Sequence, residues 1–349
     1  MTTVSELVAA AGLTGRGGAE FPTAVKIDAA RRHDAELIVN ACDGELDARK
    51  DGWVVARFLP RVLEGARHLT RQRIRVAAHR DSETLATLQA AGVDTLAVPR
   101  RYVSSEESAL TQLAHGGAAR PLMRFEPIVA GSRTRTGRRL PPTLVLNAET
   151  VWRIQQIIEF GPGWFRSYGT PDEPGPRLIT VVDGVGAPGV YPGEAGLPVT
   201  EILYRAGGLV SPMRALWIGG LGGGFLSGTS ARRAAWSRAG LAPYGLRPGA
   251  GTIRVLGTQC DPWEEILRAV TYAAGESAGQ CGPCMFGLPA VRDDVAAVAA
   301  GDRGEALDRL AHRLGQLAGR GACRFPDGIA GFLGSALRTF TEEETRSWP

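Results

Sequence analysis

The chain contains 349 residues, of which 44% are hydrophobic and 22% charged, and its formal net charge is +4. These values exclude a largely disordered chain, and so weak a charge does not favour nucleic-acid binding. No apolar run reaches the roughly 20 residues of a transmembrane helix, and the N-terminus lacks the positive start of a signal peptide. We expect a cytoplasmic protein, and leave open a peripheral attachment to a membrane complex.

The first third of the chain alternates between strand and helix patterns. Residues 36–40, 74–78 and 95–98 are short apolar runs typical of buried strands, and residues 81–91 have a helical pattern between two of them. Such alternation predicts a mostly parallel sheet with helices on its faces.

The middle and the end of the chain differ from this pattern. Residues 174–257 are rich in Gly and Pro, with a strand over 178–182 and a helix over 199–206, which suggests a small β-grasp module. Asp261 and Pro262 then predict a helix start, with an apolar face of Ile266, Leu267, Val270 and Ala274. A second helical face follows, and Gly319 to Gly321 end that helix; its residues are Leu307, Leu310, Ala311, Leu314 and Leu317.

Lysine is almost absent from the chain. Of 40 basic residues only Lys26 and Lys50 are lysines, so arginine is used wherever a general positive charge suffices. Lysine is a compact charge on a thin stem, whereas arginine is a rigid planar fork. We therefore expect both lysines to occupy positions that arginine cannot fill.

A glycine-rich loop at residues 12–26 leads into a predicted helix. Glycines allow a close approach of the backbone to a phosphate or a flavin, and a helix N-terminus attracts negative charge. Lys26 falls one turn into that helix, near the same end. The spacing differs from the usual dinucleotide fingerprint because no strand precedes the loop.

This loop resembles the flavin-binding loop of the NADH-binding FMN/iron–sulfur flavoprotein subunit of respiratory complex I, the NADH-quinone oxidoreductase. Similar segments follow in the same order along nearly the whole chain: residues 40–45 with Lys50 and Asp51, 102–110, 147–150, 163–165 with 169–170, 188–191 and 276–284. Because ordered matches are more specific than any single one, the chain is identified as a shortened, divergent member of this flavoprotein family.

The resemblance implies a site for FMN and for NADH or NADPH, and names no catalytic side chain. The FMN contacts that it implies are Gly15, Gly17, Lys26, Asn40, Tyr102, Glu106 and Asn147, with Arg16, Gly18 and Asp43 in the same cofactor site. The nicotinamide-dinucleotide contacts that it implies are Phe21, Glu45 and Glu107. A flavin accepts a hydride and releases electrons singly.

Four positions depart from the family pattern. Glu20 replaces a loop glycine, Cys42 an acidic residue beside the flavin, Ser105 a glycine and Leu146 an asparagine. Glu20 adds bulk and negative charge where a dinucleotide approaches. A non-catalytic assembly subunit with decayed nucleotide sites is therefore an open alternative.

The late cysteines resemble the family's iron–sulfur ligands. Cys281 and Cys284 form C-x-x-C, and Cys323 lies 39 residues further on. The family uses four cysteines, and the first of these positions is Ala278 here, so the resemblance implies a [4Fe–4S] or [3Fe–4S] cluster that lacks one protein thiolate. A thioredoxin-like redox pair, a zinc site with His312, and free cysteines remain alternatives.

We predict an α+β protein of three parts. They are an FMN- and dinucleotide-binding α/β domain (1–173), a β-grasp, SLBB-like module (174–257) and a C-terminal helical bundle that carries the cysteines (258–349). The predicted activity is oxidation of NADH or NADPH, with electrons passing through FMN and the cluster. The acceptor is a ferredoxin-like or [2Fe–2S] protein, or a membrane-bound one. The reverse flow, from ferredoxin to the flavin, is equally compatible with the sequence.

Overall fold

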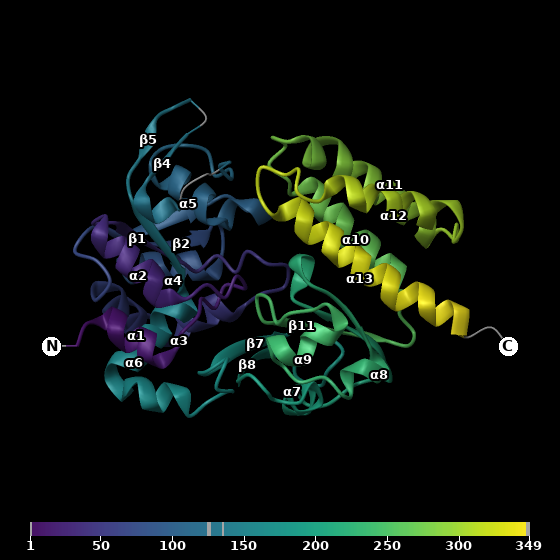
Figure 1. Ribbon diagram of the computed structural model, residues 1–349, viewed down its shortest axis with the longest axis horizontal. Coiled ribbons are helices and arrows are strands. Elements are labelled where there is room, and N and C mark those ends of the chain that lie inside the picture. Colours follow the sequence, from purple (N-terminus) through teal and green to yellow (C-terminus); the bar gives the residue numbers. More distant parts are fainter. Residues whose placement is uncertain (1, 124–126, 135, 347–349) are drawn as a thin grey trace. The chain divides into compact units, whose positions relative to one another are not determined.

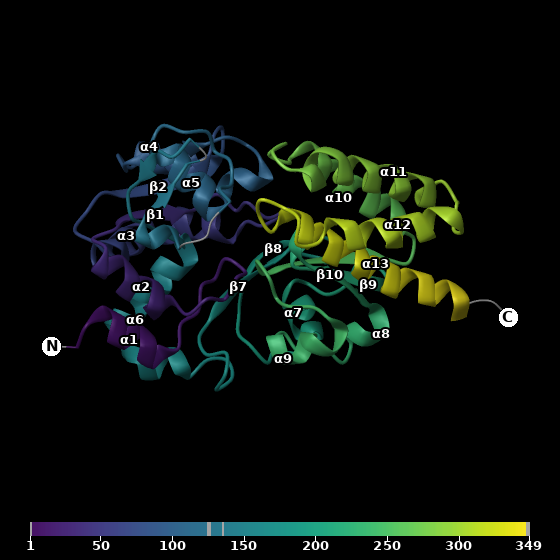
Figure 2. The same ribbon diagram turned by 45° about the horizontal axis from the view of Figure 1, so that its top comes forward.

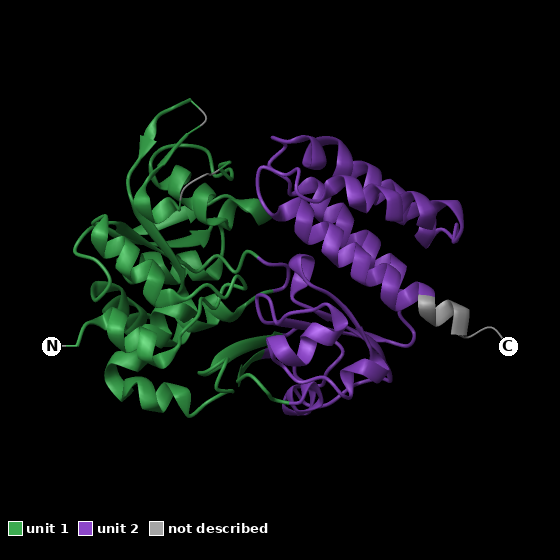
Figure 3. Ribbon diagram, in the orientation of Figure 1, with its two compact units in different colours: residues 1–44, 48–180, 190–197 green, residues 45–47, 181–189, 198–349 purple. Residues whose placement is uncertain are grey.

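The computed structural model describes residues 2–123, 127–134 and 136–346, and its contacts divide the chain into two compact units (Figure 3). The first unit contains residues 1–44, 48–180 and 190–197, and the second contains residues 45–47, 181–189 and 198–349. The division into three domains stays a prediction.

A four-stranded parallel sheet forms the centre of the first unit (Figure 1). Its strand order is β3 (Thr95–Val98), β2 (Ile74–His79), β1 (Glu36–Asn40), β6 (Thr143–Asn147). Every neighbouring pair is parallel, with Leu37 opposite Ile74 and Leu144 on either side. The parallel sheet predicted from the alternating pattern is confirmed.

Both faces of this sheet are buried, and they are covered by different helices. Leu37 and Val39 belong to the larger core with α1, α3, α4 and α6, while Ile38 packs on the opposite face with Leu110 of α5. Side chains alternate along a strand, so a strand buried on both sides is a continuous apolar run. The remaining elements of this unit are α1 (Val4–Ala11), α2 (Thr23–Arg32), α3 (Lys50–Arg67), α4 (Glu83–Ala90), η1 (Tyr102–Ser105), α5 (Glu107–Ala114), η2 (Ile128–Ala130), β4 (Ser132–Arg133), β5 (Arg139–Leu140), α6 (Ala148–Arg166), β7 (Arg177–Val181) and β8 (Gly189–Gly193).

The second unit contains an antiparallel group of strands in which β9 (Met213–Ile218) lies between β10 (Gly224–Ser227) and β11 (Thr252–Gly257). The predicted helix at 199–206 is α7 (Val199–Arg205). Short elements connect the strands: η3 (Gly220–Gly222), α8 (Gly228–Ala231), α9 (Arg238–Leu241) and η4 (Ala242–Tyr244).

The end of the second unit is a bundle of helices that run side by side (Figure 2). They are α10 (Pro262–Gly275), η5 (Pro283–Gly287, a π-helical turn), α11 (Leu288–Ala299), α12 (Glu305–Leu317) and α13 (Phe325–Arg346). The predicted N-cap is confirmed, since the Asp261 carboxylate accepts a hydrogen bond from Trp263 N at 2.8 Å.

An aromatic cluster joins this bundle to the strands of the same unit. The rings of Phe332 and Phe340 in α13 lie 5.0 Å from that of Phe225 in β10, and Trp263 of α10 lies 6.5 Å from Phe340. Gly224 allows this approach, because a Cβ there would lie 2.6 Å from Ser335 Cβ.

The apolar faces predicted for α10 and α12 are correct only in part. Ile266 and Val270 are buried in α10, and Leu310 and Leu317 in α12, but Ala311 is exposed. Each helix packs against two neighbours, so the buried positions turn towards Ala269 and Ala306. Periodicity alone does not fix that rotation.

Candidate functional site

Asn40 and Asn147 lie side by side at the carboxyl ends of β1 and β6, where their Cα atoms are paired in register. The chain passes from β1 through β2 to β3 on one side, whereas β6 lies on the other side of β1. This is a topological switch point, and ligands of open α/β sheets bind in the crevice outside such strand ends. Two predicted cofactor residues therefore meet where the fold favours a ligand.

The glycine-rich loop is held beside this point. A bridge between Thr14 and Pro22 closes the loop, and Arg16 N donates to Thr150 Oγ1 at 2.9 Å. A Cβ on Gly17 would lie 3.9 Å from Asn147 Cγ, so only backbone separates the loop from that side chain. The Asn147 amide oxygen in turn caps α6 through Thr150 N.

The predicted residues between 102 and 107 reach the same place. Asn40 Nδ2 donates to Ser105 O at 3.0 Å, and Lys26 Nζ lies 3.2 Å from Glu107 Oε1. Glu106 caps α5 by accepting from the backbone amides of Ser108 and Ala109. The structure thus gathers the loop, Lys26, both asparagines and the 102–107 segment around one end of the sheet.

The N-terminus of α2 fits a phosphate-bearing cofactor. No side chain caps this helix, which begins at Thr23 directly after the loop. The Thr23 hydroxyl is buried and has no hydrogen-bond partner among the described residues. Free helix amides with a nearby hydroxyl donor are the groups that bind phosphate oxygens. The predicted placement of Lys26 in the first turn of this helix is confirmed.

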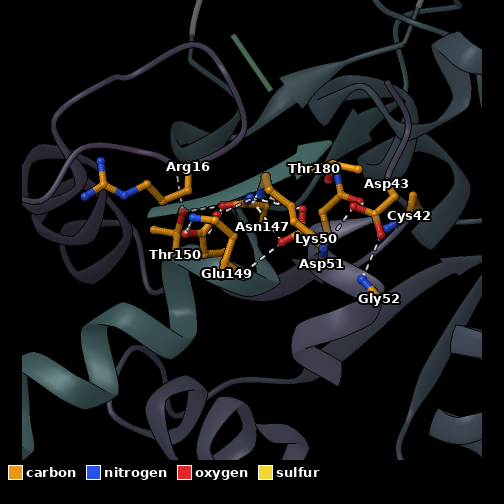
Figure 4. A network of polar contacts seen from close by, with 12 residues as sticks. Arg16, Cys42, Asp43, Lys50, Asp51, Gly52, Asn147, Glu149, Thr150 and Thr180 are labelled. Atoms are coloured by element: carbon orange, nitrogen blue, oxygen red, sulfur yellow. Dashed lines mark hydrogen bonds and ion pairs between the residues drawn. The ribbon is translucent and has the colours of Figure 1, made fainter. Parts of the chain in front are cut away.

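A buried network of charges supports the strand ends from below (Figure 4). Lys50 Nζ lies 2.9 Å from Asp51 Oδ2 and 3.1 Å from Glu149 Oε2, and all three side chains are more than nine-tenths buried. Asp51 accepts from Asn147 Nδ2 at 3.1 Å and from Glu149 N at 2.8 Å. The network therefore fixes which way the Asn147 amide faces.

The protonation of this network follows from burial and pairing. Burial alone would lower the pKa of Lys50, but Asp51 and then Glu149 raise it, so the ammonium stays charged. Burial alone would raise the pKa of Glu149, and Lys50 and Arg153 lower it. Asp43 differs: burial, then the Asp51 carboxylate, raises its pKa to about 7. Asp43 accepts from Asp51 N and Gly52 N at 2.9 and 2.7 Å.

The thiol of Cys42 lies beside this network and is buried. Burial raises its pKa well above the usual value, and Asp43 and Asp51 raise it further. A thiol with such a pKa stays protonated and is not a nucleophile. Cys42 therefore places a small neutral side chain at the position next to Asp43.

Other predicted loop residues have different roles. The Arg16 guanidinium donates to Pro174 O at 3.0 Å, and burial, then Arg177, lowers its pKa to about 9. Its side chain thus braces the unit, and its backbone faces the strand ends. Phe21 is 47% exposed and is available for stacking on a ligand. Gly18 has φ 98° and lies within the loop, and Tyr102 begins η1.

Glu20 occupies a backbone position that favours glycine. Its φ is 51°, in the left-handed region, and its carboxylate pairs with Arg177 at 3.3 Å, with Glu173 on the other side of that arginine. The negative charge anticipated at the loop is therefore largely neutralised, and the side chain is directed into the first unit rather than to solvent.

Glu45 belongs to the second unit and is engaged there. Its Oε1 accepts from Leu221 N at 2.7 Å and from Leu46 N at 2.9 Å. Gly220 is so close that a Cβ there would lie 2.3 Å from the same oxygen. The predicted ribose-binding carboxylate thus already has two backbone donors.

The three late cysteines lie close together in the second unit. Burial, then the neighbouring Cys281 and Cys323 sulfurs, raises the pKa of Cys284 to about 12. Cys284 N and Met285 N donate to Cys281 O at 3.1 and 3.0 Å, which curls the C-x-x-C turn. Soft thiolates on two loops are the donor set of an iron–sulfur cluster.

The fourth corner of such a cluster has no cysteine. Ala278 is half-buried in the loop before Cys281, and Cys260 is separated from that loop by the 14 residues of α10. A helix of this length spans about 20 Å. The predicted separation of Cys260 from the other cysteines is consistent with this helix.

The alternatives for the cysteines fit less well. In the ranges 2–123, 127–134 and 136–346, no three His, Cys, Asp or Glu side chains are grouped to hold one metal ion. His312 Nε2 lies 2.9 Å from Gln316 Nε2 instead. A cluster does not need such convergence, because each thiolate binds a different iron. A thioredoxin motif follows a strand, whereas here α10 precedes the motif.

Four residues that the sequence did not assign to the site contribute to it: Thr23, Asp51, Glu149 and Thr150. Each lies inside a segment that resembles the family, within a few positions of a predicted contact. Their hydrogen bonds to the strand ends depend on the packing of α3 and α6, which no local pattern reveals.

The geometry defines a protein with a phosphate-compatible site at a sheet switch point and a cysteine cluster in a separate unit. Family models agree with both. Residues 8–156 match the Nuo51 FMN-binding domain, and residues 264–347 match the NADH-ubiquinone oxidoreductase-F iron-sulfur binding region.

Relatives and solved structures give the same result. The chain is 29% identical to a subunit of the NADH-quinone oxidoreductase of Streptomyces coelicolor, over 95% of this chain and 80% of that protein. It is 27% identical to NAD-reducing hydrogenase HoxS subunit alpha of Cupriavidus necator, over 81% of this chain and 50% of that protein. It superimposes on a chain of the NAD+-reducing [NiFe]-hydrogenase in the H2-reduced state with a TM-score of 0.86 at 26% identity, covering 99% of this chain and 63% of that one. The chain is a divergent member of the NADH-binding flavoprotein family of NADH-quinone oxidoreductases.

The membrane question is answered only for the helices. Across the part of the chain that the structure describes, no helix combines the length and the apolar character needed to cross a bilayer.

Proposed function

We infer that this chain binds FMN and an iron–sulfur cluster, oxidises NADH or NADPH, and passes the electrons to a separate redox protein. The observation that carries this function is the convergence of the glycine-rich loop, Lys26, Asn40 and Asn147 at one end of the parallel sheet. The family models for an FMN-binding domain and an iron–sulfur region support both cofactors.

A bound FMN would accept a hydride, which is a proton and two electrons, and would release the electrons one at a time. The protein's part is to bind and orient it. Gly15 and Gly17 allow close approach, Lys26 supplies positive charge beside Glu107, and the two asparagine amides are held in fixed orientations. A flavin with one orientation presents the same face to every nicotinamide.

Cys281, Cys284 and Cys323 would hold three corners of the cluster. The acceptor of its electrons is a ferredoxin-like or [2Fe–2S] protein, or a membrane-bound one. The relatives support a partner, because their names describe subunits of larger oxidoreductases.

The test is the absorption spectrum of anaerobically purified protein during NADH addition. Flavin bands that bleach with NADH, together with a broad iron–sulfur shoulder, would support the function. Protein that takes up neither FMN nor iron on reconstitution would contradict it. Reduction of the flavin by reduced ferredoxin, but not by NADH, would indicate the reverse direction of flow.

One observation favours a second candidate, the non-catalytic assembly subunit. Glu45, expected to bind ribose hydroxyls, uses its Oε1 on the amides of Leu221 and Leu46. A protein that retains FMN yet shows no NADH-dependent bleaching, and whose removal disrupts a larger complex, would support this alternative.

A further inference from the structure

Two large apolar side chains are exposed directly after a predicted cluster ligand. Met285 is 50% exposed and Phe286 is 72% exposed, whereas Cys284 beside them is buried. Removing a side chain such as phenylalanine from water contributes about 1.5–3 kcal/mol. Leaving both in solvent, next to a redox centre, is an arrangement that a partner can use.

The turn that carries them is firmly held. Met285 N donates to Cys281 O within η5, and Gly287 packs so closely on α12 that a Cβ there would lie 2.3 Å from Leu317 Cδ2. This contact keeps η5 against α12. Met285 and Phe286 are therefore presented on an anchored surface, and their ordering entropy is partly paid in advance.

The charge around this turn is one-sided. Residues 277–288 contain no charged side chain, and residues 318–325 contain two arginines and no acid. Those residues, Arg320 and Arg324, are exposed, and neither forms an ion pair with a described residue. The flanking acids lie outside these loops: Asp327 accepts from Gly319 N at 2.7 Å, and Glu276 caps α10.

We propose that Met285, Phe286, Arg320 and Arg324 form a docking surface for a small acidic [2Fe–2S] protein of the ferredoxin type. This rests on the proposed function, since an electron leaving the cluster needs an acceptor close to the cysteines. An apolar centre with a charged rim is the usual anatomy of a transient interface, and the rim fixes the sign of the partner's charge. A second copy of this chain, with net charge +4 and the same cationic rim, is a poor match.

The experiment measures binding of the full chain, loaded with FMN and cluster, to an acidic [2Fe–2S] ferredoxin by isothermal titration calorimetry. The variants are Phe286→Ser and Arg320→Glu. Tyr204→Ser, at a side chain that is 76% exposed, and Arg232→Glu, at an exposed arginine, are matched controls elsewhere in the second unit. A basic cytochrome c serves as the charge control, and vesicles of anionic lipid as the membrane control.

Phe286→Ser should weaken ferredoxin binding by at least about tenfold, as expected for a central aromatic contact. Arg320→Glu should weaken it most at low salt, because exposed charges are screened at high salt. The control variants should bind like the parent. Equal binding by parent, Phe286→Ser and Arg320→Glu would overturn the proposal, as would a preference for cytochrome c, for vesicles or for self-association through Phe286.

A second measurement separates this proposal from the proposed function. NADH-dependent bleaching of the flavin, without any acceptor, should be the same in Phe286→Ser and the parent. Normal bleaching with unaltered ferredoxin binding would refute the docking surface alone. Absent bleaching in the parent would refute the proposed function, while the binding comparison would still decide the surface.

Discussion

The ammonium of Lys50 lies 3.1 Å from the carboxylate of Glu149, and both side chains are almost completely removed from solvent. Lys50 also contacts Asp51, which orients the amide of Asn147 at the end of β6. A buried ion pair therefore stands directly behind the candidate flavin site. Its compact ammonium fits between two carboxylates, which agrees with the expectation that lysine is kept where arginine cannot replace it.

Replacing Lys50 with Met should strongly destabilise the fold. It would leave Asp51 and Glu149 buried near Arg153 without their main partner, and breaking such a pair costs about 3–5 kcal/mol. Chemical denaturation of the first unit's signal measures this loss. Lys50→Arg should also be destabilised, and an Arg variant as stable as the parent would contradict the steric argument.

Replacing Lys26 with Met should instead weaken FMN binding with little effect on the fold. Lys26 and Glu107 are about one quarter exposed, and pairs near the surface contribute about 0.2–1 kcal/mol. The measurement is FMN affinity by fluorescence titration, with the free energy of unfolding of the apoprotein as control. Parent-like FMN affinity in Lys26→Met would show that Lys26 does not contact the flavin.

Glu20→Gly should speed reduction of the flavin by NADH. The substitution removes a side chain from the loop and relieves a left-handed backbone strain of about 1–2 kcal/mol. It also removes the pair with Arg177, so the net change in stability should be small. Stopped-flow bleaching measures the rate.

Glu20→Gln is the matched variant for this experiment. It keeps the bulk and removes the charge, which Arg177 already neutralises in the structure. We expect its rate to equal that of the parent. A rate in Glu20→Gly that is unchanged or slower would show that the loop does not restrict access.

Asp43→Asn should flatten the pH dependence of stability. Burial, then Asp51, raises the pKa of Asp43 from 3.8 to about 7, so the folded state holds this proton more tightly than the unfolded chain. The contribution is full below about pH 4 and is lost as the pH rises towards 7. Urea denaturation across this window measures it. Asp28→Asn, at an exposed residue of α2, is the control, and an unaltered slope in Asp43→Asn would contradict the assignment.

Ala278→Cys should make the iron–sulfur cluster more resistant to air. With thiolates from Cys281, Cys284 and Cys323 alone, one iron corner is exposed and its loss gives a [3Fe–4S] form. Electron paramagnetic resonance of air-exposed protein, with and without the substitution, measures this. Cys260→Ala should behave like the parent; if it loses the cluster, Cys260 is the missing ligand.

The sequence by itself determined the class of fold and the parts of the site. Apolar runs such as residues 36–40 and 74–78 are buried on both faces, so their composition alone indicates a parallel sheet. The glycine-rich loop, Lys26 and the C-x-x-C turn keep their meaning without any distant contact, because their chemistry lies in adjacent residues.

Tertiary structure alone decided how those parts are used. Strand order brought Asn40 beside Asn147, although 107 positions separate them in the chain. Packing of α3 against α6 buried Lys50 between Asp51 and Glu149, and the fold of the second unit gave Glu45 two backbone donors. Pairing of charges and burial depend on residues far apart in sequence, so their energies, and the pKa of Asp43, exist only once the chain has folded.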